Sequence, residues 1–512
     1  MTRILLAIFV LLAIAVGLFF LAGPRHSNAG KTEAQPLVVF CAAALRAPAE
    51  AAASEFTTAT GIPVRFQFGG SGQLLGSLSA GAPADLFLAG DASYIKLGRE
   101  KQVIREAIPV AEQRPVIAVP AGNPKGVHTL ADLKGLRYGL PNPESASLGR
   151  TLKEGLGPAW ADLAAAAAVT KPTVTDLLAD LQVGGLDAAL IWDANAARVP
   201  SLLAVAAPEL AALHESLVVG VCGRSGNPVA ALAFARWLAS PEHGAPVWTA
   251  NGYRALPGDA WALRPTLTLY SGGVNRLGVQ DGLKRFAERE GVEITTVFNG
   301  CGILCADMKQ LAKSPGSNFP DAYYACDLCF VPPVADLFPE AVLITETDIV
   351  LAVAKGNPKG VHTLADLAQP GLVVGLCNAE QSTLGYMTKR MLTSSGLEKA
   401  VMANVRSQVP TADLLINQLR TGSIDAAVVY AVNVKPQAAF LDSCTIDQAG
   451  AKAVQPFSVA AKSPRAQLAH RLLDHLLASR SDFEEKGFRW RGGQAPVDST
   501  TIDPDPASRT RP

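Results

Sequence analysis

The stretch Gly-Asn-Pro-Lys-Gly-Val-His-Thr-Leu-Ala-Asp-Leu occupies residues Gly122–Leu133 and returns, without a single change, at Gly356–Leu367. An identical run of this length does not arise twice by chance in a chain of 512 residues. The repeat therefore predicts that the chain contains one domain written twice. The two copies can then be compared position by position.

The duplication extends well beyond this repeat. Other short segments recur in the same order, with an offset between about 230 and 238 residues. The matching pairs are Leu37–Phe40 with Leu267–Tyr270, Phe68–Gly72 with Phe298–Gly302, Pro83–Asp85 with Pro320–Asp321, Ser147–Gly149 with Thr383–Gly385, and Asp187–Ala189 with Asp425–Ala427. Each copy has about 220 residues, which is enough to bury a core of its own. We therefore expect two whole domains in tandem rather than a solenoid of short repeats.

The charge balance and the N-terminal sequence indicate where the protein is located and which partners it is not expected to bind. The 45 Lys and Arg residues balance 45 Asp and Glu residues, so the chain lacks the basic surface that nucleic acid requires. Ile4–Ala22 is an apolar run of 19 residues preceded by Arg3. A spanning helix needs about 20 apolar residues and a cleavable signal core about 7–15, so the run favours a retained membrane anchor. A signal peptide cleaved after Ala29 is the alternative. Either one predicts an extracytoplasmic protein on the periplasmic side of the cell envelope.

Changes in composition suggest the domain boundaries. Pro- and Gly-rich stretches mark tethers and linkers, and a stretch rich in Pro, Asp, Ser and Thr marks a disordered tail. The expected division is 1–36 for the anchor or signal peptide with its tether, 37–257 for the first domain, 258–265 for the linker, 266–491 for the second domain and 492–512 for the tail.

Short apolar runs alternate with helical patterns in both copies. In the first copy the expected strands are Leu37–Cys41, Val64–Phe68, Leu86–Ala89, Val116–Val119, Arg137–Leu140 and Ala188–Trp192. The expected helices are Ala47–Thr60, Gln73–Ala80, Ala92–Glu100, Gly149–Gly155 and Thr175–Leu181. This alternation predicts an α/β fold with mostly parallel sheets. Ligands of such sheets bind beyond the carboxyl ends of the strands.

Two loops of the first copy have the chemistry of an anion site. Gly69–Gly72 reads Gly-Gly-Ser-Gly between a strand and a helix, and Ser145–Gly149 repeats this arrangement. Glycine permits a close approach of the backbone, serine supplies a hydroxyl, and a helix N-terminus supplies unpaired N–H groups. Small neutral donors without Lys or Arg suit a dehydrated oxyanion. Such segments also form ordinary turns and helix caps, which remains the alternative interpretation.

Three motifs of the first copy resemble a known family. They are Val39–Leu45 (VFCAAAL), Phe68–Leu74 (FGGSGQL) and Ala80–Asp91 (AGAPADLFLAGD), within which Gly81–Phe87 is the most distinctive piece. They are similar to the periplasmic molybdate-binding proteins of ABC transporters, over nearly all of copy one and more faintly over copy two. The resemblance implies two type II periplasmic-binding-protein domains, each with two lobes and a cleft between them. It also implies a small tetrahedral oxyanion such as molybdate as ligand and an ABC permease as partner.

The resemblance also implies a set of ligand-binding positions. They are Ala44, Ser71, Leu148, Val174 and Trp192 in the first copy, and Val274, Cys301 and Tyr430 in the second. The family's first ligand serine falls on Ala44 and Val274, where only the backbone N–H remains. Its second serine is retained as Ser71 but is replaced by Cys301, and its tyrosine falls on Trp192 and is retained as Tyr430. Leu148 and Val174 are expected to contribute backbone donors. We therefore expect copy one to be the better anion binder.

Copy two contains six of the eight cysteines, and four of them are clustered at Cys301, Cys305, Cys326 and Cys329. Cys301 and Cys326 occupy the positions of Ser71 and Gly90. An oxidising compartment favours a disulfide, for which the pair Cys301–Cys326 is our prediction. The spacing leaves two alternatives open, a thiolate metal site formed by the four cysteines or free thiols.

No motif of the chain indicates catalysis. A phosphate loop with lysine, a His-Glu-x-x-His zinc motif and a complete nucleophile elbow are all absent from the sequence. His128 and His362 precede Thr129 and Thr363, which is typical of a helix-capping turn. We therefore expect no enzymatic activity and no cofactor. The leading hypothesis is a solute-binding protein that captures an oxyanion for ABC-type transport. The alternatives are a membrane-anchored sensor or adaptor, and a thiol–metal or redox module in the second domain.

Overall fold

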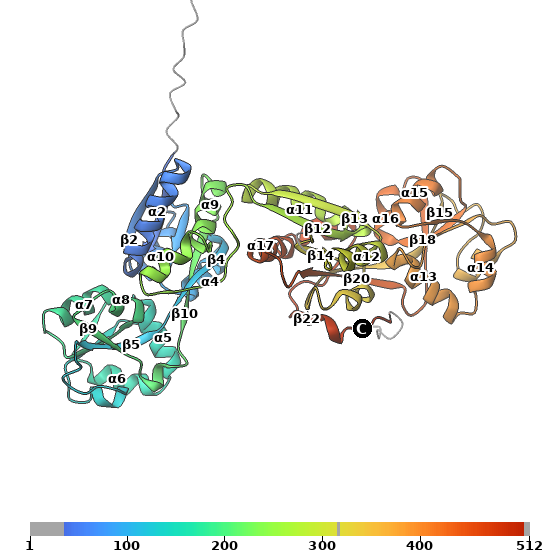
Figure 1. Cartoon of the computed structure of the whole chain (residues 1–512). Helices are drawn as coiled ribbons and strands as arrows, with labels where there is room; N and C mark the ends of the chain where they lie inside the picture. Colours follow the sequence, from blue (N-terminus) through green and yellow to red (C-terminus); the bar gives the residue numbers. More distant parts are fainter. Residues whose placement is uncertain (1–34, 315–317, 506–512) are drawn as a thin grey trace, which may run out of the picture.

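The computed structural model describes residues 35–314 and 318–505, which form two α/β domains of two lobes each (Figure 1). The expected anchor, residues 4–22, lies outside the described residues. Within the described ranges, no helix combines the length and the apolar character that a membrane span requires.

The first lobe of the first domain contains a six-stranded sheet of order β11-β4-β10-β3-β1-β2. Its parallel strands β1, β2 and β3 are each followed by a helix, and β10 runs antiparallel to β3 and β4. The strands are β1 (Leu37–Ala42), β2 (Val64–Gly69), β3 (Leu86–Leu88), β4 (Ile104–Gln113), β10 (Glu215–Cys222) and β11 (Arg254–Ala255). The helices are α2 (Arg46–Thr60), α3 (Ser71–Ser79), α4 (Ala92–Glu100), α9 (Pro228–Ala239) and α10 (Gly244–Ala250).

The second lobe contains a five-stranded sheet of order β7-β6-β8-β5-β9. Its central strand β8 is buried along its whole length, as a strand covered on both faces should be. The strands are β5 (Pro115–Pro120), β6 (Tyr138–Pro141), β7 (Val169–Lys171), β8 (Ala188–Trp192) and β9 (Leu202–Val205). The helices are α5 (Ser147–Leu156), α6 (Ala159–Ala166), α7 (Val174–Gln182) and α8 (Asp193–Ala197).

The second domain repeats this plan with one change in its sheet. Its strands form a single eleven-stranded sheet whose main path is β13-β12-β14-β20-β15-β18-β16-β17. The strands are β12 (Thr266–Gly272), β13 (Glu293–Asn299), β14 (Ala322–Tyr324), β15 (Glu340–Ala354), β16 (Val374–Cys377), β17 (Val405–Val409), β18 (Ala426–Tyr430), β19 (Leu441–Thr445), β20 (Lys452–Val459), β21 (Arg489–Trp490) and β22 (Val497–Asp498). The helices are α11 (Arg276–Glu290), α12 (Cys301–Leu311), α13 (Thr383–Ser394), α14 (Glu398–Asn404), α15 (Ala412–Arg420), α16 (Ala431–Val434), α17 (Ala466–Leu477) and α18 (Arg480–Lys486).

Strand β15 accounts for this change. It pairs with β20 in one lobe through Val342–Asp348 and with β18 in the other through Ile349–Val353, without a break. In the first domain the same path is interrupted at Arg114, between β4 and β5. The two lobes of the second domain are therefore connected by a continuous strand.

The identical twelve-residue repeat forms the same turn in both domains. Gly122 and Asn123 have positive φ, as do Gly356 and Asn357, which suits glycine and asparagine. A capping box then joins Thr129 to Asp132, and its counterpart joins Thr363 to Asp366. His128 and His362 contribute a backbone N–H to the same carboxylates, as the capping interpretation predicted. The repeat is thus retained as a structural connection after β5 and β15.

Part of the segment that we expected to be a disordered tail is ordered. Strand β22 pairs with Glu340–Ala341 of β15, and the N–H of the buried Ser499 donates to the carbonyl of Pro339 at 2.9 Å. The prediction of disorder from composition was therefore wrong for these residues, because it could not anticipate an unpaired edge of the second sheet that accepts a further strand.

A buried ion cluster joins the two domains. Glu290 at the end of α11 is 1% exposed and accepts hydrogen bonds from Arg471 of α17 at 2.7 Å and from Arg236 of α9 at 3.1 Å. Burial alone would raise the pKa of Glu290, but the charges of Arg471 and Arg236 hold it below its ordinary value. Since Arg236 belongs to the first domain, this carboxylate connects both domains.

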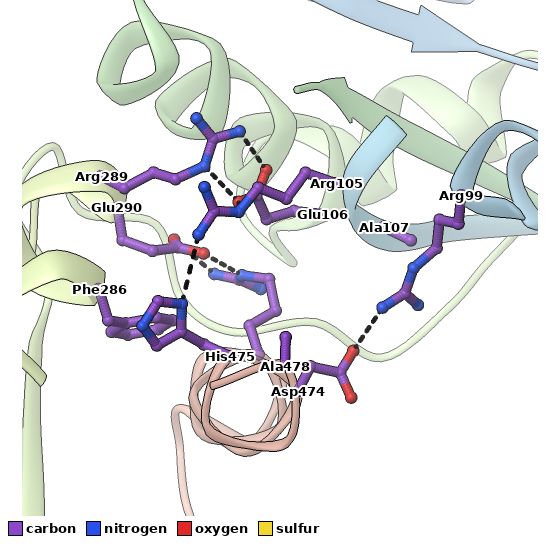
Figure 2. A pocket seen from close by; sticks show the side chains of 11 residues that line it. Arg99, Arg105, Glu106, Ala107, Phe286, Arg289, Glu290, Asp474, His475 and Ala478 are labelled. Carbon is purple, nitrogen blue, oxygen red and sulfur yellow. Dashed lines mark hydrogen bonds and ion pairs between the residues drawn. The ribbon is translucent and has the colours of Figure 1, made fainter. Parts of the chain in front are cut away.

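More exposed ion pairs surround this cluster (Figure 2). Arg289 binds both carboxylate oxygens of Glu106, at 2.5 and 2.8 Å, and Arg99 binds Asp474 at 3.3 Å. The residues of these pairs line an interdomain cavity of about 80 Å³. The expected linker contributes as well, because the carboxylate of Asp259 accepts the N–H groups of Gln467 and Leu468 at the start of α17.

Replacing Glu290 should destabilise the protein strongly. Glu290→Ala leaves two buried guanidinium groups without their shared counter-charge, which typically costs about 3–5 kcal/mol. The matched control is Glu484→Ala, which removes an exposed pair with Arg480 and should change stability by no more than about 1 kcal/mol. Guanidinium unfolding followed by circular dichroism measures both variants. Equal effects of the two substitutions would contradict the assigned role of Glu290.

Candidate functional site

A small cavity of about 40 Å³ lies between the two lobes of the first domain. The first lobe contributes the end of β1 with the turn that follows it, the junction of β2 and α3, Gly90 and Gln113. The second lobe contributes Ser145–Ser147, Pro172–Val174 and Trp192. No lysine, arginine or carboxylate is among these lining residues. Neutral groups therefore surround the cavity.

The structure places most of the expected ligand-binding residues at this cavity. Ala44, Ser71, Val174 and Trp192 all line it. Leu148 is not among the lining residues, and its side chain is buried in the second lobe, but its expected role as a backbone N–H donor in the first turn of α5 does not depend on the side chain.

Three helices begin at this cavity. The first residues of α3, α5 and α7 are Ser71, Ser147 and Val174. Neither α3 nor α5 has a side-chain cap, so N–H groups of their first turns are not satisfied by a capping side chain. Each helix also contributes the positive end of its dipole. Converging helix N-termini of this kind form an anion-binding site.

Gly90 lies at the cavity beside Ser71, although it is not one of the expected ligand-binding positions. Its N–H donates to the Oγ of Ser71 at 3.0 Å, and its carbonyl accepts from the side-chain amide of Gln113 at 2.6 Å. A Cβ at this position would stand 2.6 Å from the Oγ of Ser147 and 3.4 Å from that of Ser71. Glycine at position 90 therefore lets the two hydroxyls approach each other from opposite lobes. In the sequence, the recurrence of Gly90-Asp91 as Cys326-Asp327 indicates that this position belongs to the cleft in both domains.

Contacts beside the cavity join its lobes. The guanidinium of Arg150 on α5 lies 4.4 Å from the centre of the Tyr94 ring on α4. Thr151 of the second lobe donates a hydrogen bond to Glu215 at the start of β10, at 3.1 Å. Burial, and then the charge of Asp91, raise the pKa of Glu215 to about 7. Glu215 is thus a carboxyl group at the lobe boundary that titrates near neutral pH.

Stability should depend on the ionisation of Glu215. Because its pKa is raised from 4.5 to about 7 in the folded state, its contribution is fully present below pH 4.5 and is lost as the pH rises through about 7. The unfolding free energy of the unmodified protein should therefore fall across this window relative to Glu215→Gln. Denaturant titrations at several pH values measure the difference, with the exposed Glu144→Gln as control. Parallel pH profiles for the protein and Glu215→Gln would refute the assignment.

The corresponding cleft of the second domain is closed by the protein itself. The N–H groups of Gly302 and Ile303, in the first turn of α12, donate to the carbonyl of Gln381 in the opposite lobe at 3.1 and 3.4 Å. A Cβ on Gly302 would clash with the carbonyl of Glu380, so only glycine allows this approach. Among the described residues of the first domain, no hydrogen bond joins the equivalent N–H groups to the opposite lobe.

The expected ligand positions of the second domain are buried in this closed cleft. Val274, Cys301 and Tyr430 are each no more than 3% exposed. The N–H of Cys326 donates to the Sγ of Cys301 at 3.2 Å, in the same way that the Gly90 N–H donates to Ser71. The thiols of Cys301 and Cys326 are adjacent and free in the structure, so the expected disulfide stays a prediction.

Cys301 is the more acidic of the two thiols. Burial alone would raise its pKa, but hydrogen bonds, led by the one from the Cys326 thiol, lower the pKa to about 7. The same hydrogen bond, together with burial, raises the pKa of Cys326 well above its ordinary value. The hydrogen bond therefore favours the thiolate at Cys301 and the protonated thiol at Cys326, at the position where the first domain has the hydroxyl of Ser71.

The other two clustered cysteines make contacts of their own. The Sγ of Cys305 lies 3.4 Å from the carbonyl of Phe330 and 3.6 Å from the hydroxyl of Tyr323. The N–H of Cys329 donates to the carboxylate of Asp327. In the described parts of the chain, no three His, Cys, Asp or Glu side chains come together in a group that could hold a metal ion.

Comparison with known proteins assigns the class. The family of bacterial extracellular solute-binding proteins matches this chain twice, over residues 37–254 and 267–489. The chain therefore belongs to that family and contains two of its domains in tandem, the second of them divergent. This assignment confirms the α/β binding-protein fold that the repeat and the motifs predicted.

Individual relatives correspond to one domain each. The molybdate-binding protein ModA of Mycobacterium tuberculosis is 29% identical over 225 residues, which are 41% of this chain and 82% of that protein. A putative binding protein of Haemophilus influenzae is 24% identical over 43% of this chain and 91% of its own length. The periplasmic molybdate-binding protein of Azotobacter vinelandii is 21% identical, with a TM-score of 0.38, over 43% of this chain and 99% of that one.

Proposed function

We propose that the first domain captures a small tetrahedral oxyanion, with molybdate as the leading candidate, and delivers it to an ABC permease in the membrane. The observation that carries this proposal is the convergence of three helix N-termini and two serine hydroxyls on one neutral cavity. Backbone N–H groups and hydroxyls can replace the hydration shell of an oxyanion without the strong, indiscriminate attraction of a charged side chain.

The membership in the solute-binding family and the similarity to ModA support the same ligand class. They also support an extracytoplasmic location, for which the N-terminal apolar run would supply the membrane anchor. The proposed ligand contacts are the hydroxyls of Ser71 and Ser147 and the backbone N–H groups at Ala44, Leu148 and Val174. Trp192 would form a wall of the cavity. The site needs no cofactor, and this proposal includes no catalytic step.

Closure of the second cleft supports a division of labour between the domains. In that domain the backbone donors of α12 are already bound to the carbonyl of Gln381, and the thiol of Cys301 replaces the hydroxyl of Ser71. An oxyanion would have to displace the carbonyl of Gln381 from these donors, and it would lack the hydroxyl that Ser71 supplies in the first domain. We therefore assign oxyanion binding to the first domain alone.

Removal of the Ser71 hydroxyl should weaken oxyanion binding. A hydrogen bond to a charged ligand contributes roughly 1–2 kcal/mol, so Ser71→Ala should raise the dissociation constant for molybdate about 5- to 30-fold. The control is Ser79→Ala, at the exposed end of the same helix, which should bind like the unmodified protein. Isothermal titration calorimetry with molybdate, tungstate, sulfate and phosphate measures the affinities. Failure of every one of these anions to bind the unmodified protein would refute the proposed function.

A further inference from the structure

In the second cleft, Cys301 and Cys326 place two sulfur atoms close together. The equivalent residues of the first cleft are Ser71, which has a hydroxyl, and Gly90, which has no side chain. Cys301 begins α12 as Ser71 begins α3, and Cys326 follows β14 as Gly90 follows β3. The same backbone N–H hydrogen bond joins the two positions in both domains, at 3.2 and 3.0 Å. The chemistry of the donor atoms has changed while their placement has not.

A compensating substitution makes room for the second sulfur. Position 272 at the end of β12 is glycine, whereas the equivalent residue at the end of β1 is Ala42. A Cβ at Gly272 would overlap the Sγ of Cys326 and lie 3.1 Å from the Sγ of Cys301. Both sulfur atoms therefore lie beside one point of the backbone. Gly272 lacks the methyl group that Ala42 has at the equivalent position, and the side chain of Cys326 occupies the space that this methyl group would fill.

A buried hydroxyl beside the sulfur pair has no partner. The Tyr430 hydroxyl has no hydrogen-bond partner within the described structure, although its residue is only 3% exposed. Cys326 and Cys301 are the charges that act on it most strongly. Buried polar groups are normally satisfied, so the Tyr430 hydroxyl is available to a ligand in this cleft.

We propose that Cys301 and Cys326 bind one thiophilic d¹⁰ cation, Cu⁺ being the representative ion, inside the second cleft. Sulfur ligands select soft cations, whereas the oxygen donors of the first cleft suit a hard oxyanion. On binding, two copper–sulfur bonds form and the remaining thiol protons leave to solvent, with no change of oxidation state. This function is separate from the oxyanion binding assigned to the first domain.

The number of ligands points to this type of ion. Structural Zn²⁺ takes four ligands and Ca²⁺ takes six to eight, and the described residues offer no third His, Cys, Asp or Glu beside the pair. A d¹⁰ monovalent ion accepts two thiolates in a linear arrangement. The closed cleft keeps water from the remaining positions, because the hydrogen bonds of Gly302 and Ile303 to Gln381 hold the lobes together.

The test is an anaerobic titration of the reduced, full-length protein with Cu⁺ in competition with a chromogenic Cu⁺ chelator. One ion per chain should bind to the unmodified protein, and this ion should be lost in Cys301→Ser and in Cys326→Ser. Cys301→Ser introduces the residue that the first domain has at the equivalent position, Ser71. The control is Cys305→Ser, one turn further along α12, which should retain the ion.

Two results would overturn the proposal. The first is equal Cu⁺ binding by the unmodified protein and both variants, which would place the ion elsewhere or show that it binds non-specifically. The second is a Cys301–Cys326 disulfide that mass spectrometry finds in the protein isolated from its native compartment and that mild reductant does not open. In that case the pair would be a structural bridge. Circular dichroism of each variant confirms that it is folded before its binding is compared.

Discussion

The N–H groups at the start of a helix need hydrogen-bond acceptors, and this requirement shapes both clefts of the protein. In each domain a helix begins at the lobe boundary with a small residue between glycines. In the first domain the donors of α3 face a neutral cavity, where a ligand can satisfy them. In the second domain the carbonyl of Gln381 satisfies the donors of α12. One constraint on one scaffold therefore leads to an open binding site in one copy and a closed cleft in the other.

The connection between the lobes also differs between the two domains, and it is less flexible in the second. The first domain interrupts its crossing strand at Arg114, whereas β15 of the second domain continues through both lobes. A strand that continues from one lobe into the other resists the hinge motion that ligand capture requires. The buried Glu290 cluster then holds the closed domain against the first one. The second domain thus combines a less flexible lobe connection with a cleft that is closed by hydrogen bonds between its lobes.

Much of the fold could be predicted from sequence because the signals were local or repeated. The twelve-residue repeat indicated two domains, and alternating apolar and helical segments indicated α/β lobes. The beginnings of the key helices were less accurate. Helices α3 and α5 begin at Ser71 and Ser147, two residues before the expected starts, because these serines are the first helical residues rather than parts of a preceding loop.

The site itself was only partly predictable. Ser71 and Trp192 could be found from motifs, whereas Gly90 and Gln113 act through contacts that only the folded chain creates. Likewise, the closure of the second cleft depends on Gln381, which lies about 80 residues from α12 and carries no motif. Composition also failed for the ordered residues near the C-terminus, where pairing with β15 outweighs an intrinsically polar sequence.

The most direct test of this account is the number of molybdate ions that one chain binds at saturation. Equilibrium dialysis of the full-length protein, with molybdenum counted by elemental analysis, gives that number. The account predicts one ion per chain, because only the first cleft leaves its backbone donors to a ligand. Two ions per chain would show that the second cleft opens and binds the same anion. That result would contradict the division of function between the two domains.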